Sequence, residues 1–83
     1  MFFVYIIQSK KNKSFYVGSC ENLRHRFKLH NKGLVKSTKR YVPWVLVYKE
    51  SFHNLKDARR RESQIKSWKK RELIEKLVKH FKI

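Results

Sequence analysis

The sequence predicts a small α+β sandwich with its elements in the order ββαβαα. Three segments are rich in aromatic and β-branched residues, which is the composition typical of strands. Three others repeat apolar residues at helical spacing. The chain has 83 residues, of which 41% are hydrophobic, so we expect one domain over residues 1–83 with a small core.

The first two strands are expected over Phe2–Gln8 and Phe15–Ser19, as a hairpin joined by the turn SKKNKS. With KKNK as the loop, Tyr5 lies opposite Gly18, and Tyr16 lies diagonally across from Tyr5 on the same face. Because glycine has no side chain, we expect a hollow beside the Tyr5 hydroxyl in which a phosphate could sit. Alternatively, the two tyrosines pack flat on a helix with their hydroxyls in solvent.

The segment ENLRHRFKLHNKG predicts a helix, with Asn22 as its N-cap and Gly33 as its C-terminal stop. A basic loop, VKSTKRY, then leads through Pro43 to a third strand, WVLVY. This strand is apolar on both faces, which predicts a central position in the sheet.

Two more helices are expected near the C-terminus. The first begins near Asn54, which forms a capping pair with Asp57, and it ends at about Lys66. The second is expected over residues 69–81. Its apolar stripe consists of Ile74, Leu77, Val78 and Phe81.

The composition indicates a polyanionic partner. Lys and Arg number 22 against 6 Asp and Glu, a net charge of +16. Because neutralising phosphates releases condensed counterions, this charge predicts binding to nucleic acid. The alternative is a lysine-rich surface that maintains solubility. We expect no membrane partner, since no segment joins a basic face to a wide, exposed aromatic face.

The expected location is the cytoplasm. No apolar stretch approaches the ~20 residues that span a bilayer, and no signal peptide is visible. The single cysteine, Cys20, excludes an internal disulfide and a multi-cysteine zinc site.

The small number of acids limits the possible chemistry. Two-metal phosphodiesterases usually need several carboxylates that converge on one spot, and this chain has only 6 acidic residues in all. If the protein cuts a phosphodiester, we therefore expect one metal ion with few protein ligands.

Three polar residues fall on the apolar faces of the predicted helices. These faces read Leu23, Arg26, Phe27 and His30 in the first helix, and Leu55, Ala58, Glu62 and Ile65 in the second. Burying an unpaired charge is costly, so Arg26, His30 and Glu62 need partners, ligands or a cleft. Alternatively, Arg26 extends into solvent and His30 is a hydrogen-bonded residue at the core edge. Glu62 could instead pair with Arg59 or Arg61.

Four motifs occur in order over positions 3 to 68. The first two are Phe3-Val4-Tyr5 and Tyr16-Val17-Gly18. The segment NLRHRFKLHN resembles a Leu-x-x-Arg helix that ends in His-Asn, with Arg26 and His30 in the marked places. ARRRESQIKSW resembles an Arg-Glu-x-x-Ile-Lys-x-Trp segment, with Glu62 as the acid. In these motifs the chain resembles the GIY-YIG nuclease superfamily, specifically small stand-alone members grouped with the nuclease domain of an excinuclease.

The resemblance implies a three-stranded antiparallel sheet flanked by helices, and a metal-dependent endonuclease that hydrolyses DNA phosphodiesters. Glu62 would bind one divalent cation, Mg²⁺ or Mn²⁺, that remains largely hydrated. Tyr5 would take the proton from the attacking water, or relay it, and Tyr16 would orient the water or the phosphate. Arg26 would hold the developing negative charge, and His30 would assist positioning or proton transfer.

Other residues are expected to contact the nucleic-acid backbone. They are Gly18, Lys36, Lys39, Arg40, Arg61 and Lys66. The alternative function is a non-catalytic nucleic-acid-binding protein that keeps the nuclease fold, and a ribosome-associated or RNA-tethering role is a third reading. The partner is expected to be DNA, with RNA left open. Specificity would come from a distorted substrate, a protein partner or self-association.

Overall fold

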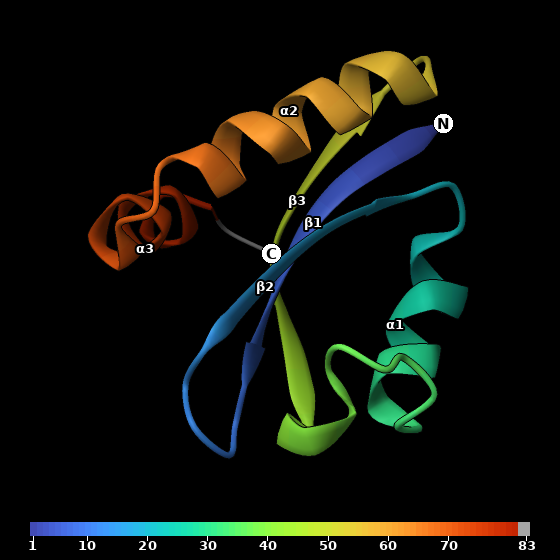
Figure 1. Cartoon of the computed structure of the whole chain (residues 1–83). Helices are drawn as coiled ribbons and strands as arrows, with labels where there is room; N and C mark the ends of the chain where they lie inside the picture. Colours follow the sequence, from blue (N-terminus) through green and yellow to red (C-terminus); the bar gives the residue numbers. More distant parts are fainter. Residues whose placement is uncertain (82–83) are drawn as a thin grey trace.

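The computed structural model describes residues 1–81. Its elements are β1 (Phe2–Ser9), β2 (Phe15–Cys20), α1 (Leu23–Asn31), the 3₁₀ turn η1 (Lys39–Tyr41), β3 (Trp44–Phe52), α2 (Leu55–Ser67) and α3 (Arg71–Lys79). The strands form one antiparallel sheet in the order β2-β1-β3, with α1 on one face and α2 and α3 on the other (Figure 1). The predicted α+β fold and its ββαβαα order are confirmed.

The predicted hairpin register is confirmed. Tyr5 pairs with Gly18 and Ile7 with Tyr16, so both tyrosines point to the same face as α1. The turn is closed by the buried Ser9 hydroxyl, which accepts the backbone N–H groups of Lys11 and Asn12. A short polar side chain that bonds the backbone two or three residues ahead is a common way to fix a turn.

The predicted central position of the third strand is wrong. β3 lies at an edge of the sheet and β1 lies in the centre, where all four residues from Val4 to Ile7 are buried. In β3 the residues between Trp44 and Tyr48 are only half-buried. Both segments are apolar on both faces, so apolar content alone did not distinguish the strand that is fully covered from the strand that is partly covered.

The sheet separates two apolar clusters. The cluster on the α2 and α3 face consists of Val4, Ile6, Val17, Tyr48, Ala58 and Ile65. The cluster on the α1 face consists of Tyr5, Ile7, Cys20 and Trp44. The predicted stripe of α3 packs against the first cluster, with its side chains half-buried. None of the helices within residues 1–81 is long and apolar enough to cross a membrane.

The predicted helix boundaries hold at both caps. The Asn22 side chain accepts the backbone N–H of His25 at 3.0 Å, and Asn54 accepts that of Asp57 at 2.8 Å. Gly33 ends α1 with a φ of +73°, a left-handed conformation that glycine adopts without strain. α3 begins later than expected because Lys69, with a φ of 54°, forms the turn that precedes it, and it ends at Lys79, two residues before the expected end.

Candidate active site

A buried hydrogen-bonded chain connects β1, α1 and the loop after α1. The Tyr5 hydroxyl lies 2.8 Å from Nε2 of His30, and Nδ1 of His30 lies 2.7 Å from Oγ1 of Thr38. His30 and Thr38 have no exposed surface, and Tyr5 is 2% exposed. The alternative of tyrosine hydroxyls left in solvent is therefore wrong for Tyr5.

The hydrogen bonds assign the His30 tautomer. The Thr38 hydroxyl donates to the carbonyl of Val35 at 3.4 Å, so its oxygen is left to accept a proton from the imidazole. Nδ1–H of His30 then donates to Thr38, and the lone pair on Nε2 accepts the hydroxyl proton of Tyr5.

The pKa shifts of this pair agree with that assignment. Burial raises the pKa of Tyr5 well above its ordinary value, and the nearby Tyr16, Cys20 and Glu62 add to the effect. Burial, and then the charge of Arg26, lower the pKa of His30. At neutral pH the phenol is therefore protonated and the imidazole is neutral, as a phenol donor and an imidazole acceptor require.

Tyr16 lies beside this chain on β2. Its ring centre is 5.2 Å from that of His30 and 6.5 Å from that of Tyr5. The Tyr16 side chain is half-buried, so part of it faces solvent at the edge of the sheet. The two tyrosines and the histidine form one aromatic group, as the shared face of the hairpin predicted.

Gly18 does not leave the predicted hollow. A Cβ atom at this position would lie 2.5 Å from Oη and 2.7 Å from Cζ of Tyr5. The phenol of Tyr5 itself occupies the space, so the expectation of a phosphate-sized hollow is wrong. The absent side chain instead allows the Tyr5 ring to lie directly against β2.

Glu62 reaches the same strand from the opposite face of the sheet. Its carboxylate accepts hydrogen bonds from the Ser19 hydroxyl at 2.5 Å and from the Lys66 ammonium at 2.6 Å. The Lys66 ammonium also lies 6.0 Å from the centre of the Tyr16 ring. Because β2 is an edge strand, Lys66 can bond Glu62 on the α2 face and still approach Tyr16 on the α1 face, so it links the two residues around that edge. The ion-pair partner of Glu62 is thus Lys66, and neither of the alternatives, Arg59 and Arg61.

Arg26 stands one helical turn before His30, with its side chain exposed. It takes part in none of the ion pairs found among residues 1–81. Its positive charge adds to the lowering of the His30 pKa and opposes the rise that burial causes in the Tyr5 pKa. Arg26 thus extends into solvent, as one alternative expected, one helical turn from His30.

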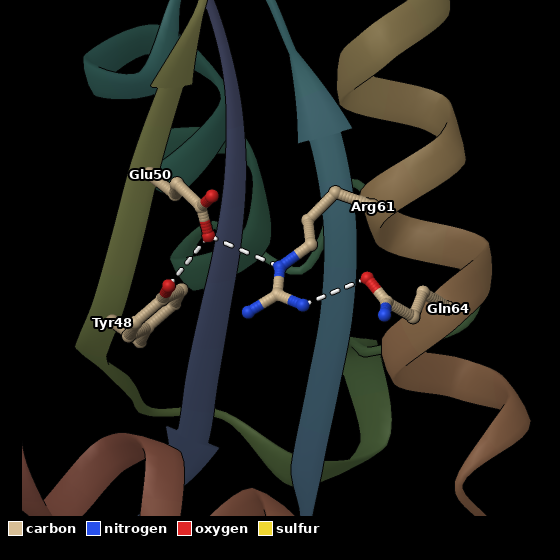
Figure 2. Close-up of polar contacts among 4 residues, drawn as sticks. All are labelled: Tyr48, Glu50, Arg61 and Gln64. Carbon is tan, nitrogen blue, oxygen red and sulfur yellow. Dashed lines mark hydrogen bonds and ion pairs between the residues drawn. The ribbon is translucent and has the colours of Figure 1, made fainter.

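Of the predicted backbone-binding residues, Gly18 is buried against Tyr5, so its expected contact with the nucleic-acid backbone is wrong, and the others lie in three places. Lys36, Lys39 and Arg40 are exposed on the loop that carries Thr38, and Lys66 lies beside Glu62. Arg61 is set apart. Figure 2 shows it reaching from α2 across the sheet to Glu50 on β3, where Nε donates to the carboxylate at 3.1 Å.

The donor set fits only a largely hydrated cation. Within residues 1–81 there is no group of three or more His, Cys, Asp or Glu side chains that could enclose a metal ion. Glu62 is a half-buried carboxylate with its side chain 19% exposed, and the Ser19 hydroxyl lies next to it. Mg²⁺ is commonly held by one or two carboxylates, substrate phosphates and several waters, so these residues suit it.

Three residues at the site were not singled out from the sequence. Thr38 lies in the basic loop, where no periodicity marks it, and Ser19 follows the second tyrosine motif without a distinguishing signal. Asn31 fastens α1 to β3, because its amide both accepts from the N–H of Trp44 and donates to its carbonyl. For Asn31, the one signal in the sequence was its position directly after His30, at the end of the segment that resembles the His-Asn motif.

The sheet order and the helix placement are those of a nuclease-type α+β fold. Residues 1–77 match the GIY-YIG catalytic domain, and the chain belongs to this family, whose members are generally nucleases.

Relatives of similar length support the assignment. The chain is 40% identical over 73 residues to UPF0213 protein SH2523 of Staphylococcus haemolyticus, covering 87% of this chain and 88% of the relative. It is 43% identical over 67 residues to UPF0213 protein CPE1444 of Clostridium perfringens, covering 80% and 71%. The solution structure of UPF0213 protein BH0048 from Bacillus halodurans matches with a TM-score of 0.60 and 32% identity, covering 95% of this chain and 84% of that one.

Proposed function

We propose that the protein is a metal-dependent endonuclease that hydrolyses phosphodiester bonds in DNA with a single divalent cation, Mg²⁺ or Mn²⁺. The observation that carries the proposal is the buried hydrogen bond of Tyr5 to His30, at 2.8 Å, together with the half-buried Glu62 carboxylate, which bonds Ser19 of β2 and the Lys66 ammonium near the Tyr16 ring. A protein that only binds phosphate has no need of this combination.

Tyr5 acts in this proposal as a proton relay. Its raised pKa means that the phenolate is scarcely populated at neutral pH. Tyr5 is therefore still protonated when the water attacks, and it can accept a proton only if it passes on its own. The attacking water gives a proton to the Tyr5 oxygen while the hydroxyl proton of Tyr5 moves to Nε2 of His30. The neutral imidazole can accept that proton, and Thr38 holds its other nitrogen in place.

The remaining residues act on charge and position. The guanidinium of Arg26 stabilises the negative charge that develops on the phosphate, a role suited to its planar set of donors. Tyr16 orients the water or the phosphate at the edge of the sheet. Glu62, beside Ser19, would hold the cation, which would polarise the phosphate and favour loss of a proton from water.

Positive side chains around the site would bind the rest of the substrate. Lys36, Lys39 and Arg40 on the Thr38 loop, and Lys66 on α2, are exposed. Their contacts would go to phosphates, since the net charge of +16 favours a polyanion of any sequence.

The test is Glu62→Gln, with Glu72→Gln as the control because Glu72 is an exposed acid on α3. We expect Glu62→Gln to abolish Mg²⁺-dependent cleavage and to leave DNA binding unchanged or tighter, while Glu72→Gln cleaves like the unmodified protein. The measurement is a cleavage panel over branched, nicked, single-stranded and duplex DNA, with RNA included. Cleavage retained by Glu62→Gln would overturn the assignment of the cation to this residue.

A second candidate is a non-catalytic nucleic-acid-binding protein. The observation in its favour is that Ser19 and Lys66 already satisfy the Glu62 carboxylate without a cation. Extended incubation of the unmodified protein with supercoiled plasmid and Mg²⁺ or Mn²⁺ separates the two functions. Nicking that Glu62→Gln abolishes supports the endonuclease, and no nicking supports the binding protein.

A further inference from the structure

A basic hollow of about 300 Å³ lies next to the candidate active site, between β2 and the turn from α2 to α3. Phe15, Tyr16 and Val17 of β2 form one side. The other side consists of two isoleucines, Ile65 and Ile74, and four cationic residues, Lys66, Lys69, Lys70 and Arg71. We refer to this space as the β2-edge hollow. Tyr16 belongs both to its wall and to the aromatic group with His30.

One wall of the β2-edge hollow is held in place by Arg71. Its Nη2 donates to the carbonyl of Lys13 at 2.6 Å, and its guanidinium lies 4.6 Å from the centre of the Phe15 ring. Arg71 also lies 3.5 Å from the Glu75 carboxylate. These contacts join the start of α3 to the hairpin, so the wall exists before any ligand arrives.

Two lysines at the rim are available to a ligand. Lys69 and Lys70 are exposed, and neither takes part in the ion pairs found in the described part of the chain. The left-handed backbone of Lys69, with a φ of 54°, makes the turn that sets both lysines beside the hollow. Two exposed ammonium groups at one rim favour an anion.

The wall opposite these charges favours a ligand that has an aromatic part in addition to a phosphate. Phe15 and Tyr16 are half-buried and offer aromatic surface, which a phosphate does not use but a nucleic-acid base does. A volume of about 300 Å³ is at the small end of ligand sites and suits a single nucleotide. A base within a duplex is stacked and paired on both sides and cannot enter such a space.

We propose that the β2-edge hollow binds one unpaired nucleotide next to the phosphate that is cleaved. The base packs against the Phe15 and Tyr16 side of the hollow, and the flanking phosphates contact Lys69 and Lys70. This inference rests on the proposed endonuclease function and narrows its substrate class to nucleic acid with a single-stranded segment at the cleavage point. Because both DNA and RNA contain such segments, the test includes both.

The test compares two double variants that remove the same charge. Lys69→Ala with Lys70→Ala alters the hollow, whereas Lys56→Ala with Lys79→Ala alters exposed lysines at the far ends of α2 and α3. Binding is measured by fluorescence anisotropy in EDTA, so that no cleavage occurs. The probes are oligothymidylate and oligouridylate of about 12 nucleotides, and a paired DNA duplex of the same length.

We expect the hollow variant to weaken single-strand binding roughly tenfold more than the control variant, and the two variants to weaken duplex binding equally. An excess loss confined to oligothymidylate assigns the site to DNA, and one confined to oligouridylate assigns it to RNA. Equal losses by both variants on every probe would overturn the proposal, since general charge would then explain the binding. These results need no catalysis, so they stand apart from the cleavage test of Glu62.

A second measurement uses the unmodified protein. Irradiation of an oligonucleotide that carries 5-iodouracil should cross-link the base to Phe15 or Tyr16, as peptide mapping by mass spectrometry would show. Cross-links that map only to other aromatic residues would place the base elsewhere and would overturn the proposal.

Discussion

At the scale of single residues, the site depends on how closely Tyr5, Gly18 and His30 pack. Gly18 lets the phenol lie against β2, and the phenol in turn reaches Nε2 of His30. Both ring nitrogens of His30 are bonded in a place with no solvent exposure. A proton added to His30 would convert its acceptor nitrogen to a donor in this buried place, at a cost in stability.

The first prediction concerns pH. Because the folded-state pKa of His30 is lowered from 6.5, the unfolded chain binds more protons at pH values between the two. The His30 contribution to stability is therefore fully present above pH 6.5 and is lost as pH falls through the folded-state pKa. The free energy of unfolding should decrease by up to about 1.4 kcal/mol per pH unit within that window.

Urea unfolding between about pH 7.5 and 5 measures this dependence in three proteins: the unmodified chain, His30→Gln and, as control, His25→Gln on the exposed side of α1. The free energy of unfolding should depend less on pH in His30→Gln than in the unmodified chain, whereas His25→Gln should keep the full dependence. An NMR titration that found the His30 imidazole pKa above 6.5 would contradict the prediction.

At the scale of elements, two polar connections fix the helices on the sheet. Asn31 joins the end of α1 to the start of β3. On the other face, the Glu50 carboxylate of β3 accepts the Tyr48 hydroxyl at 2.6 Å and Nε of Arg61, which comes from α2 (Figure 2). The Arg61 guanidinium also donates to Gln64 at 2.8 Å. This network gives Arg61 a structural task away from the candidate active site.

The second prediction concerns Arg61→Ala, with Arg60→Ala as a control that removes the same charge from an exposed neighbour. Loss of Arg61 leaves the half-buried Glu50 with only Tyr48 as its partner, and should lower the free energy of unfolding by roughly 1–3 kcal/mol. Arg60→Ala should change it by less than about 0.5 kcal/mol. Thermal and urea unfolding provide the measurement.

Nucleic-acid affinity of the same two variants tests the backbone-binding role expected of Arg61. Equal, small losses of affinity in the two variants would agree with a structural role for Arg61. A much larger loss in Arg61→Ala, with stability unchanged, would instead support direct contact with the backbone.

At the scale of the whole molecule, charge and sheet order act together. The net charge of +16 attracts nucleic acid from any direction, whereas the edge position of β2 gathers Tyr16, Glu62 and Lys66 in one place. If β2 were the central strand, a neighbouring strand would separate the carboxylate of α2 from the phenols on the opposite face. The location of the candidate site is thus a property of the topology.

The third prediction follows from the net charge. Nucleic-acid affinity should fall by roughly 10³-fold between about 50 and 200 mM salt, because each contacted phosphate releases counterions. Anisotropy titrations over a salt series measure this, with the hollow variant as a comparison that should show a shallower slope. Affinity that changed little with salt would contradict binding through phosphates.

The features that could be predicted from the sequence are those that depend on neighbouring residues. The KKNK loop set the hairpin register that pairs Tyr5 with Gly18, and the side chains of Asn22 and Asn54 set the helix starts. These features follow from contacts within a few residues, which local pattern records. The inward position of His30 was likewise predicted by the helical period, and the structure buries it fully.

The arrangement of segments that are distant in the sequence could not be predicted and was set by long-range packing. This packing placed β1 and not β3 in the centre, filled the space at Gly18 with the Tyr5 ring, and chose Ser19 and Lys66 as the partners of Glu62. Each outcome depends on which segment occupies a given part of the interior and so keeps other segments out of it. Periodicity assigns a side chain to a face, but the atoms it meets there are fixed only when all the elements compete for the same volume.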